Sequence, residues 1–262
     1  MKKIFTLLMI VAFLKPVFSQ YEEMIDVSDA LQSTLDLRTS AVRIVKDYLY
    51  RGLKVNYVSK ENDNNLSKGE TSLLKLEIYG KEHPEFNTEI NKVKKQWKKL
   101  RHLAINLPKK EKMNGLLDDL NDFLRDTENL IEGIKNTDNI KIINYQHASN
   151  KMEILAQQLA FLFGLKVAGV DGQHILKEIE KCQKDFQRNL DLTFFSGENT
   201  IEITEVLKSI QADWEMGKQT NKSANKDRFL NTIYILMNKI SDNARKASLL
   251  YQEKAKTELK KK

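Results

Sequence analysis

The sequence carries an internal repeat, and this repeat restricts the chain to folds built from two similar halves. Its only two tryptophans, Trp97 and Trp214, are 117 residues apart, and each follows a glycine, Gly80 or Gly197, by 17 residues. The same displacement carries two further apolar positions over, Ile90 onto Leu207 and Val93 onto Ile210. We therefore expect two copies of one unit. The alternative is a single elongated bundle in which the similarity reflects only general helix patterning.

Both copies are predicted to be helical. The 262 residues include only 3 prolines and 10 glycines, and 30% of them are charged. In the first copy, apolar residues recur at helical spacing over residues 31–52, 70–79, 85–105 and 110–134. A polar segment over 59–69 is expected to form a turn, and Gly80 and His83-Pro84 are expected to break the second helix after Tyr79. The pattern is typical of an all-α fold with two tandem antiparallel four-helix-bundle units.

The predicted organisation has three parts. Residues 1–19 are expected to be a signal peptide, and residues 20–136 and 137–262 the two helical units, with a boundary in the polar stretch 136–139. The signal has Lys2 and Lys3, an apolar run of 11 residues and a small-residue cleavage site before Gln20. We therefore expect a periplasmic or secreted protein. A short membrane-tethered N-terminus is the alternative, and no further long apolar run predicts a membrane span after signal removal.

Charge and composition argue against several classes of function. The formal net charge is +7, or +4 without the three lysines of the signal, and basic and acidic residues alternate, so no nucleic-acid partner is predicted. No nucleophile elbow, zinc-protease, phosphate-loop or dinucleotide motif occurs, so we expect neither an enzyme nor a cofactor. Cys182 is the only cysteine, which excludes an intrachain disulfide.

One group of residues has the spacing of a possible metal site. His174, Glu178 and Cys182 stand at i, i+4 and i+8, so on a helix they could offer a nitrogen, a carboxylate and a thiolate from one face. Three polar groups on a solvated helix explain the same spacing. Because no second cluster of ligands accompanies them, no metal site is predicted.

The segment 31–52 has a narrow apolar seam interrupted by one arginine. At heptad spacing it contains Leu31, Leu35, Arg38, Val42, Val45, Leu49 and Gly52. A guanidinium in such a seam must reach water, pair with a carboxylate or bind an anion from outside, because a buried unpaired charge costs several kcal/mol. The partner of Arg38 is therefore the main functional question.

The segment around Arg38 resembles the first-helix motif of the PilJ/NarX-like sensory domain. That motif is roughly R-M-L-S-Q-R-I-A-K-x-Y-L, and this chain agrees with it at Arg38, Arg43, Ile44, Lys46, Tyr48 and Leu49. In the second copy, residues 154–160 (ILAQQLA) look like M-L-S-Q-R-I-A. The resemblance therefore extends to both halves.

This resemblance implies an extracytoplasmic four-helix sensor domain. In the nitrate- and nitrite-responsive members, paired first helices place the leading arginine of the motif on a small anion, and Arg38 matches that arginine. The second copy departs from the motif, with Glu153, Gln158 and Phe161 in place of the two arginines and the lysine. No output domain is recognised in this chain, so we expect a partner to carry any signal.

The matching face of the second copy is a polar stripe of Gln146, Asn150, Glu153, Gln157 and Ala160. Either Glu153 neutralises Arg38 where the two first helices meet, or the stripe faces water, as polar helix faces usually do. The candidate ligand-binding residues are Arg38, Arg43, Glu153 and Gln157. The predicted ligand is a small anion such as nitrate, nitrite or a short carboxylate.

Two functions follow from these patterns. The first is an exported sensory module without its own output domain. The alternative is a structural or adaptor protein of the cell envelope that binds a protein partner or forms a homodimer. The two predictions differ over Arg38: an internal carboxylate partner favours the structural role, and an open polar cavity favours the ligand.

Overall fold

The computed structural model describes residues 24–55, 62–113, 115–135, 141–170, 172–220 and 226–259. Within these ranges the chain forms helices and no strand, so the predicted all-α fold class is confirmed. The helices are α2 (Val27–Gly52), α3 (Asn62–Glu82), η1 (Pro84–Phe86), α4 (Asn87–Leu100), α5 (His102–Ile105), α6 (Lys110–Met113), α7 (Leu116–Lys135), α8 (Lys141–Ala168), α9 (Gly172–Phe194), α10 (Ile201–Thr220) and α11 (Lys226–Leu259). The predicted signal peptide and the predicted boundary at 136–139 lie outside the described residues.

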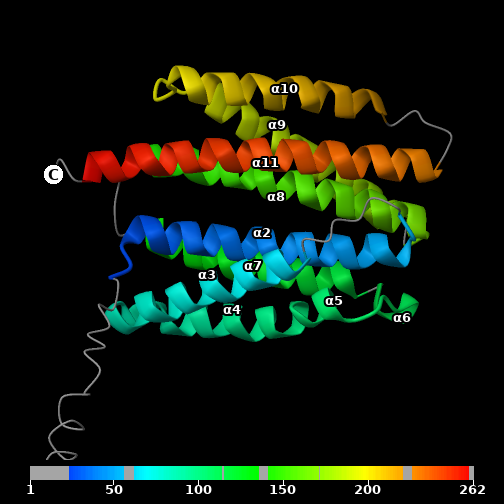
Figure 1. Cartoon of the computed structure of the whole chain (residues 1–262), viewed down its shortest axis with the longest axis horizontal. Coiled ribbons are helices and arrows are strands. Elements are labelled where there is room, and N and C mark those ends of the chain that lie inside the picture. The colour runs from blue at the N-terminus through cyan, green and yellow to red at the C-terminus, as the bar shows by residue number, and fades with distance from the viewer. Residues whose placement is uncertain are drawn as a thin grey trace, which may run out of the picture.

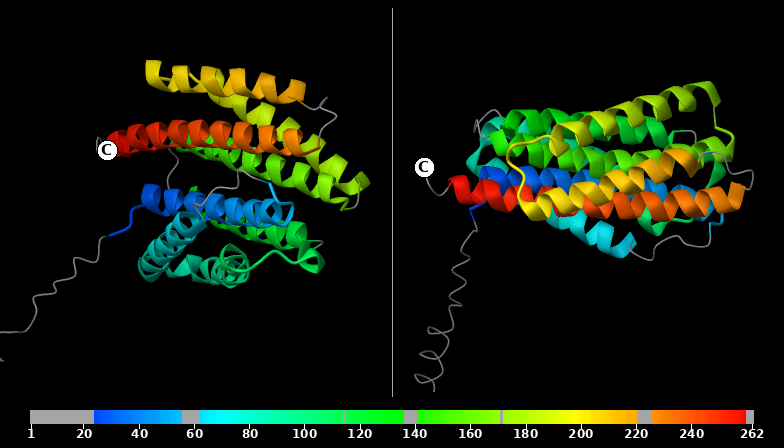
Figure 2. Two further views of the ribbon diagram at one scale, coloured as in Figure 1. Left: turned by 45° about the vertical axis from the view of Figure 1, so that its right-hand side comes forward. Right: turned by 90° about the horizontal axis from the view of Figure 1, so that it is seen from above.

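The long helices stack in layers, with α2, α7, α8 and α11 in the middle. Figure 1 shows α9 and α10 on one side of this central group and α3 and α4 on the other, and the views of Figure 2 agree. Helix α8 packs against α2, α9 and α11, so it joins the two halves of the chain. None of the described helices combines the length and the apolar composition needed to cross a membrane.

Helix α2 is a core helix. Asp26 caps its N-terminus, because its carboxylate accepts a hydrogen bond of 2.7 Å from the backbone N–H of Asp29. Of its 26 residues, 20 are buried, including the seam residues Leu31, Leu35, Arg38, Val42, Val45 and Leu49. The seam is therefore buried as predicted, but the opposite face of α2 is buried as well. Polar residues on that face must find partners inside the protein.

Three predicted helix boundaries were wrong. Helix α3 begins at Asn62, within the segment predicted as a turn, and continues past Gly80 to Glu82. A Cβ at Gly80 would lie 2.9 Å from the Cδ1 atom of Ile90, so this glycine allows close packing of α3 on α4 and does not end the helix. The helix predicted over 110–134 is divided into α6 and α7, with Gly115 in a turn between them.

The two tryptophans make matching hydrogen bonds. Trp97 Nε1 donates to Glu70 Oε1 at 3.0 Å, and Trp214 Nε1 donates to Gln187 Oε1 at 2.9 Å. Each acceptor oxygen also bonds a cation one turn after the tryptophan, Arg101 at 2.9 Å in the first case and Lys218 at 3.1 Å in the second. All three members of the second set are displaced by 117 residues from the first. This shared register supports the predicted repeat.

The residues against the two indoles differ. A Cβ at Gly69 would lie 2.2 Å from the Cη2 atom of Trp97, so the ring occupies the space of a side chain. At the position 117 residues later, Phe186 packs on Trp214 with a ring-centroid distance of 4.2 Å. Each half therefore fills the same space with a different pair of residues.

Candidate functional site

The polar stripe of α8 does not face water. Gln146, Asn150, Glu153, Gln157 and Ala160 are all completely buried, which contradicts the prediction of a solvated face. Helix α11 covers the stripe and contributes polar residues of its own to the interface. The polar composition of the stripe suggested contact with water. The stripe is nevertheless buried, because the polar residues of α11 pack against it.

Gln157 belongs to a buried cluster around Lys46. The Nζ atom of Lys46 donates to Gln157 Oε1 and to Asn238 Oδ1, both at 2.6 Å, and lies 3.4 Å from Asp47 Oδ1. It also lies 4.2 Å from the centroid of the Tyr234 ring. Burial lowers the pKa of Lys46 to about 8. Gln157 therefore accepts a hydrogen bond from a buried cation, and its oxygen is not available to a ligand.

Arg43 and Glu153 lie near one another in the same interface. The Nη2 atom of Arg43 bonds Asp242 at 2.6 Å and Ser241 Oγ at 3.1 Å, and lies 3.9 Å from Glu153 Oε1. The carboxylate of Glu153 is also 3.8 Å from Arg245, which bonds Asp36 at 3.0 Å.

Both arginines thus have closer carboxylates than Glu153. The attraction of Arg43 and Arg245 does not compensate for the desolvation of the Glu153 carboxylate, so burial raises the pKa of Glu153 to about 8. Glu153 is therefore largely protonated at neutral pH. Its Oε2 atom accepts a hydrogen bond from Asn150 Nδ2 at 3.0 Å.

Arg38 pairs with a carboxylate that the sequence analysis did not single out. Its Nη1 atom lies 2.6 Å from Glu128 Oε2, on α7, whereas the predicted pairing with Glu153 is wrong. The side chain is buried, and its Nε atom has no hydrogen-bond partner among the described residues. The guanidinium is thus neutralised, but not all of its donors are used.

Glu128 is the centre of a larger ion cluster. Its Oε1 atom lies 2.6 Å from Lys151 Nζ, and its Oε2 atom lies 3.5 Å from His147 Nε2. Burial alone would raise the pKa of Glu128, but the neighbouring His147, Arg38 and Lys151 hold that pKa well below its usual range. Desolvation lowers the pKa of His147, which is almost fully buried.

The same cluster offers a possible set of metal ligands. One donor atom each from Glu128, Glu132 and His147 lies within 4.8 Å of the others. However, Lys135 Nζ lies 3.1 Å from Glu132 and 3.3 Å from His147 Nδ1, and Arg38 and Lys151 neutralise Glu128. A divalent cation would have to displace these groups, so we assign no metal to the cluster.

The metal-ligand spacing at residues 174, 178 and 182 does not form a site. His174 is exposed, whereas Cys182 is buried and its thiol donates to the backbone oxygen of Leu155 at 3.4 Å. Burial raises the pKa of this thiol well above its usual range. A neutral thiol inside the protein and an exposed imidazole cannot share an ion.

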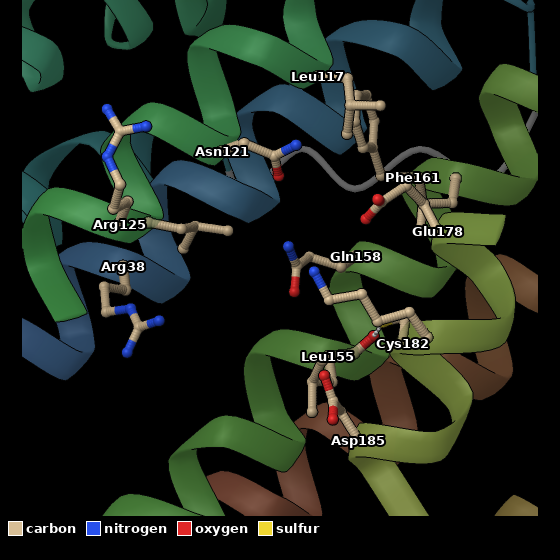
Figure 3. A pocket seen from close by; sticks show the side chains of 13 residues that line it. Arg38, Leu117, Asn121, Arg125, Leu155, Gln158, Phe161, Glu178, Cys182 and Asp185 are labelled. Atoms are coloured by element: carbon tan, nitrogen blue, oxygen red, sulfur yellow. Dashed lines mark hydrogen bonds between the residues drawn. The ribbon is translucent and has the colours of Figure 1, made fainter. Parts of the chain in front are cut away.

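A pocket of about 250 Å³ lies between α7, α8 and α9, and Arg38 contributes to its wall. Figure 3 shows Arg38 and Arg125 on one side of it, Cys182 and Asp185 on the other, and Gln158 between them. The apolar part of the lining consists of Leu117, Leu124, Leu155, Phe161 and Leu162. Among the four predicted ligand-binding residues, only Arg38 lines this pocket.

Sequence reasoning missed the residues next to Arg38, although a signal was present. Glu128 lies one turn after Leu124 and one turn before Ile131, so it is a carboxylate on the apolar face of the predicted helix. Such a residue needs a buried cation as its partner. Gln158 and Phe161, where the second copy departs from the family motif, line the pocket.

Comparison of the chain with protein-family models finds no match, and comparisons with curated proteins and with solved structures find none either. The resemblance of the Arg38 segment to the PilJ/NarX-like motif therefore stays an expectation from the sequence.

Proposed function

We propose that this protein is an exported helical module that binds a small organic anion in the pocket between α7, α8 and α9, with Arg38 as the anchor. The observation that carries the proposal is a buried guanidinium that lines a pocket and whose Nε donor has no hydrogen-bond partner within the described part of the chain. A guanidinium matches a carboxylate because two parallel N–H groups can engage its two oxygens.

The lining supports an organic ligand over an inorganic ion. Five apolar side chains from α7 and α8 form one part of the pocket wall, while polar and charged side chains, among them the carboxylates of Glu178 and Asp185 on α9, form the rest. Ligand sites commonly combine apolar walls with a few polar groups that set the orientation. A volume of about 250 Å³ suits a molecule of the size of butyrate or benzoate better than nitrate, which would leave the apolar wall uncovered.

The other predicted ligand residues have an internal role in this proposal. Arg43, Glu153 and Gln157 bond groups on α2, α8 and α11, and none of them lines the pocket. Of the four predicted ligand-binding residues, only Arg38 therefore belongs to the proposed anion site.

The test is calorimetric titration of butyrate, benzoate and nitrate into the wild type and Arg38→Lys. We expect the wild type to bind the two carboxylates and Arg38→Lys to lose most of that affinity, since lysine cannot make the paired contact. A carboxylate at 100 times its dissociation constant should stabilise the wild type by about 2.7 kcal/mol.

Arg101→Lys is the matched control, because Arg101 pairs with Glu70 and does not line the pocket. Its affinity for both carboxylates should equal that of the wild type. Equal binding by the wild type and Arg38→Lys, or no binding by either, would contradict the proposal.

A structural or adaptor role is the second candidate, and the Arg38–Glu128 ion pair favours it. An arginine with an internal carboxylate needs no ligand, and the buried polar contacts of α2, α8 and α11 suit a rigid spacer. Absence of carboxylate binding in the titration would favour this role.

A further inference from the structure

The charged cluster around Glu128 lies one helical turn beyond residues of α7 and α8 that line the pocket. On α7, Glu128 lies one turn beyond Leu124, and on α8, Lys151 lies one turn before Leu155, and both leucines line the pocket. Glu128 and Lys151 bond one another at 2.6 Å across the two helices. The ion cluster therefore lies next to the pocket, on the side to which Arg38 belongs.

Arg38 has a different neighbour on each side. Towards the pocket it forms part of the wall, and towards the cluster its Nη1 atom holds Glu128 Oε2. A carboxylate that enters the pocket would meet a guanidinium that already holds a carboxylate. Two anions on one guanidinium repel each other, so the ligand and Glu128 compete for Arg38.

Glu128 has a second position within reach. Its Oε1 atom is held by Lys151, so the carboxylate keeps one strong bond if Oε2 leaves Arg38. The Nε2 atom of His147 is 3.5 Å from that Oε2 atom, is buried, and has no hydrogen-bond partner among the described residues. With its proton on Nε2, the imidazole would donate to Oε2 after a small rotation of the carboxylate.

We propose that Glu128 is an internal competitor of the ligand, which bonds Arg38 in the empty protein and moves to His147 and Lys151 when an organic carboxylate binds. This inference rests on the proposed function. It also accounts for an ion pair between Arg38 and Glu128 beside a pocket that Arg38 lines. The other charged groups at the cluster, Glu132 and Lys135, pair with each other at 3.1 Å and lie 3.9 and 3.3 Å from His147 Nδ1, on the side of the ring away from Arg38.

The test is titration of benzoate into Glu128→Gln. Removal of the competing charge should tighten benzoate binding about tenfold, which corresponds to roughly 1.4 kcal/mol, the scale of a charge-assisted hydrogen bond. Glu132→Gln is the matched control, because it removes the same charge from the same helix without touching Arg38. It should leave the affinity close to that of the wild type.

A double-mutant cycle tests whether the gain in benzoate affinity depends on Arg38. In the Arg38→Lys background, Glu128→Gln should add little affinity, because the bond for which Glu128 competes is already weakened. If Glu128→Gln does not fold, Glu128→Asp replaces it, since the shorter side chain weakens the bond to Arg38.

The outcomes separate this inference from the proposed function. Wild-type binding with unchanged or weaker binding by Glu128→Gln would overturn the competitor role and leave the binding function intact. Equal gains in Glu128→Gln and Glu132→Gln would also overturn it, because the effect would then be general electrostatics. Absence of benzoate binding in all variants would overturn both.

Discussion

At the scale of single residues, the protein places ionisable groups in its interior and neutralises them in pairs. Lys46 and Arg43 on α2 reach partners on α8 and α11, and Arg38 reaches α7. Glu153 differs, because its nearest cations among the described residues, Arg43 and Arg245, are 3.9 and 3.8 Å away, and burial raises its pKa to about 8. A carboxyl group with a raised pKa makes stability depend on pH.

We predict that Glu153 destabilises the fold as the pH rises. Because its pKa is about 8 in the folded state and 4.5 is the ordinary value, its favourable contribution is complete below pH 4.5 and is lost between pH 4.5 and 8. The loss can reach about 1.4 kcal/mol per pH unit. Urea unfolding from pH 5 to 8 should show Glu153→Gln gaining stability relative to the wild type.

Glutamine keeps an oxygen that can accept the hydrogen bond from Asn150, so the substitution isolates the charge. The lowered pKa of Lys46 acts above this window, between about 8 and 10.5. A constant difference between the two proteins from pH 5 to 8 would mean that Glu153 is ionised throughout.

At the scale of helices, close contact between α2 and α8 holds the two halves together. Gly164 lies where α8 meets α2, and a Cβ there would be 2.8 Å from Tyr50 Cε2 and 2.9 Å from Leu49 Cδ2. Tyr50 cannot easily move away, because it is buried and its hydroxyl donates to the backbone oxygen of Ala160 at 2.8 Å. The glycine is therefore a packing residue inside a helix.

Gly164→Ala should destabilise the protein by about 1–3 kcal/mol, the usual cost of overpacking, although alanine favours helix by about 1 kcal/mol. Gly217→Ala is the control within α10. There a Cβ would lie 3.2 Å from Met237 Cε and 3.3 Å from Leu236 Cδ2, both ends of flexible side chains. Thermal unfolding should show a lower midpoint for Gly164→Ala and an equal or higher one for Gly217→Ala, and the reverse order would contradict the packing argument.

At the scale of the whole molecule, the two predicted halves share one interior. Helices α2, α8 and α11 enclose a common set of polar residues, and the core of apolar side chains is continuous across both halves. Separation of the halves would expose Lys46 and Arg43 without their partners. These buried contacts between the two predicted halves favour unfolding as one cooperative unit.

We expect a single unfolding transition, and the two tryptophans allow this to be measured in each half. In Trp214→Phe the fluorescence reports on Trp97 in α4, and in Trp97→Phe it reports on Trp214 in α10. For each variant, the urea midpoint from fluorescence should equal that from far-ultraviolet circular dichroism. A fluorescence midpoint that precedes the dichroism midpoint would show that the halves unfold separately.

The sequence alone determined the helical class, the main helices and the burial of the Arg38 seam, because these depend on composition and on local spacing of apolar residues. The displacement of 117 residues between the two tryptophans was also visible in the sequence, and the structure adds hydrogen-bond partners and cations that recur with the same displacement. The sequence was less informative about the end of α3. Gly80 was expected to break this helix, but the glycine permits close packing on α4, and a local pattern does not show which helix lies next to it.

Only the tertiary structure decided the partners of the buried charges. Glu128 lies 90 residues from Arg38, and Asp242 lies 199 residues from Arg43, so no local pattern pairs them. A water-facing stripe on α8 was one of the two alternatives from the sequence, because a polar helix face usually meets water, but the polar residues of α11 cover it. Which charges meet depends on how distant helices pack, and that arrangement alone places Arg38 between Glu128 and the pocket.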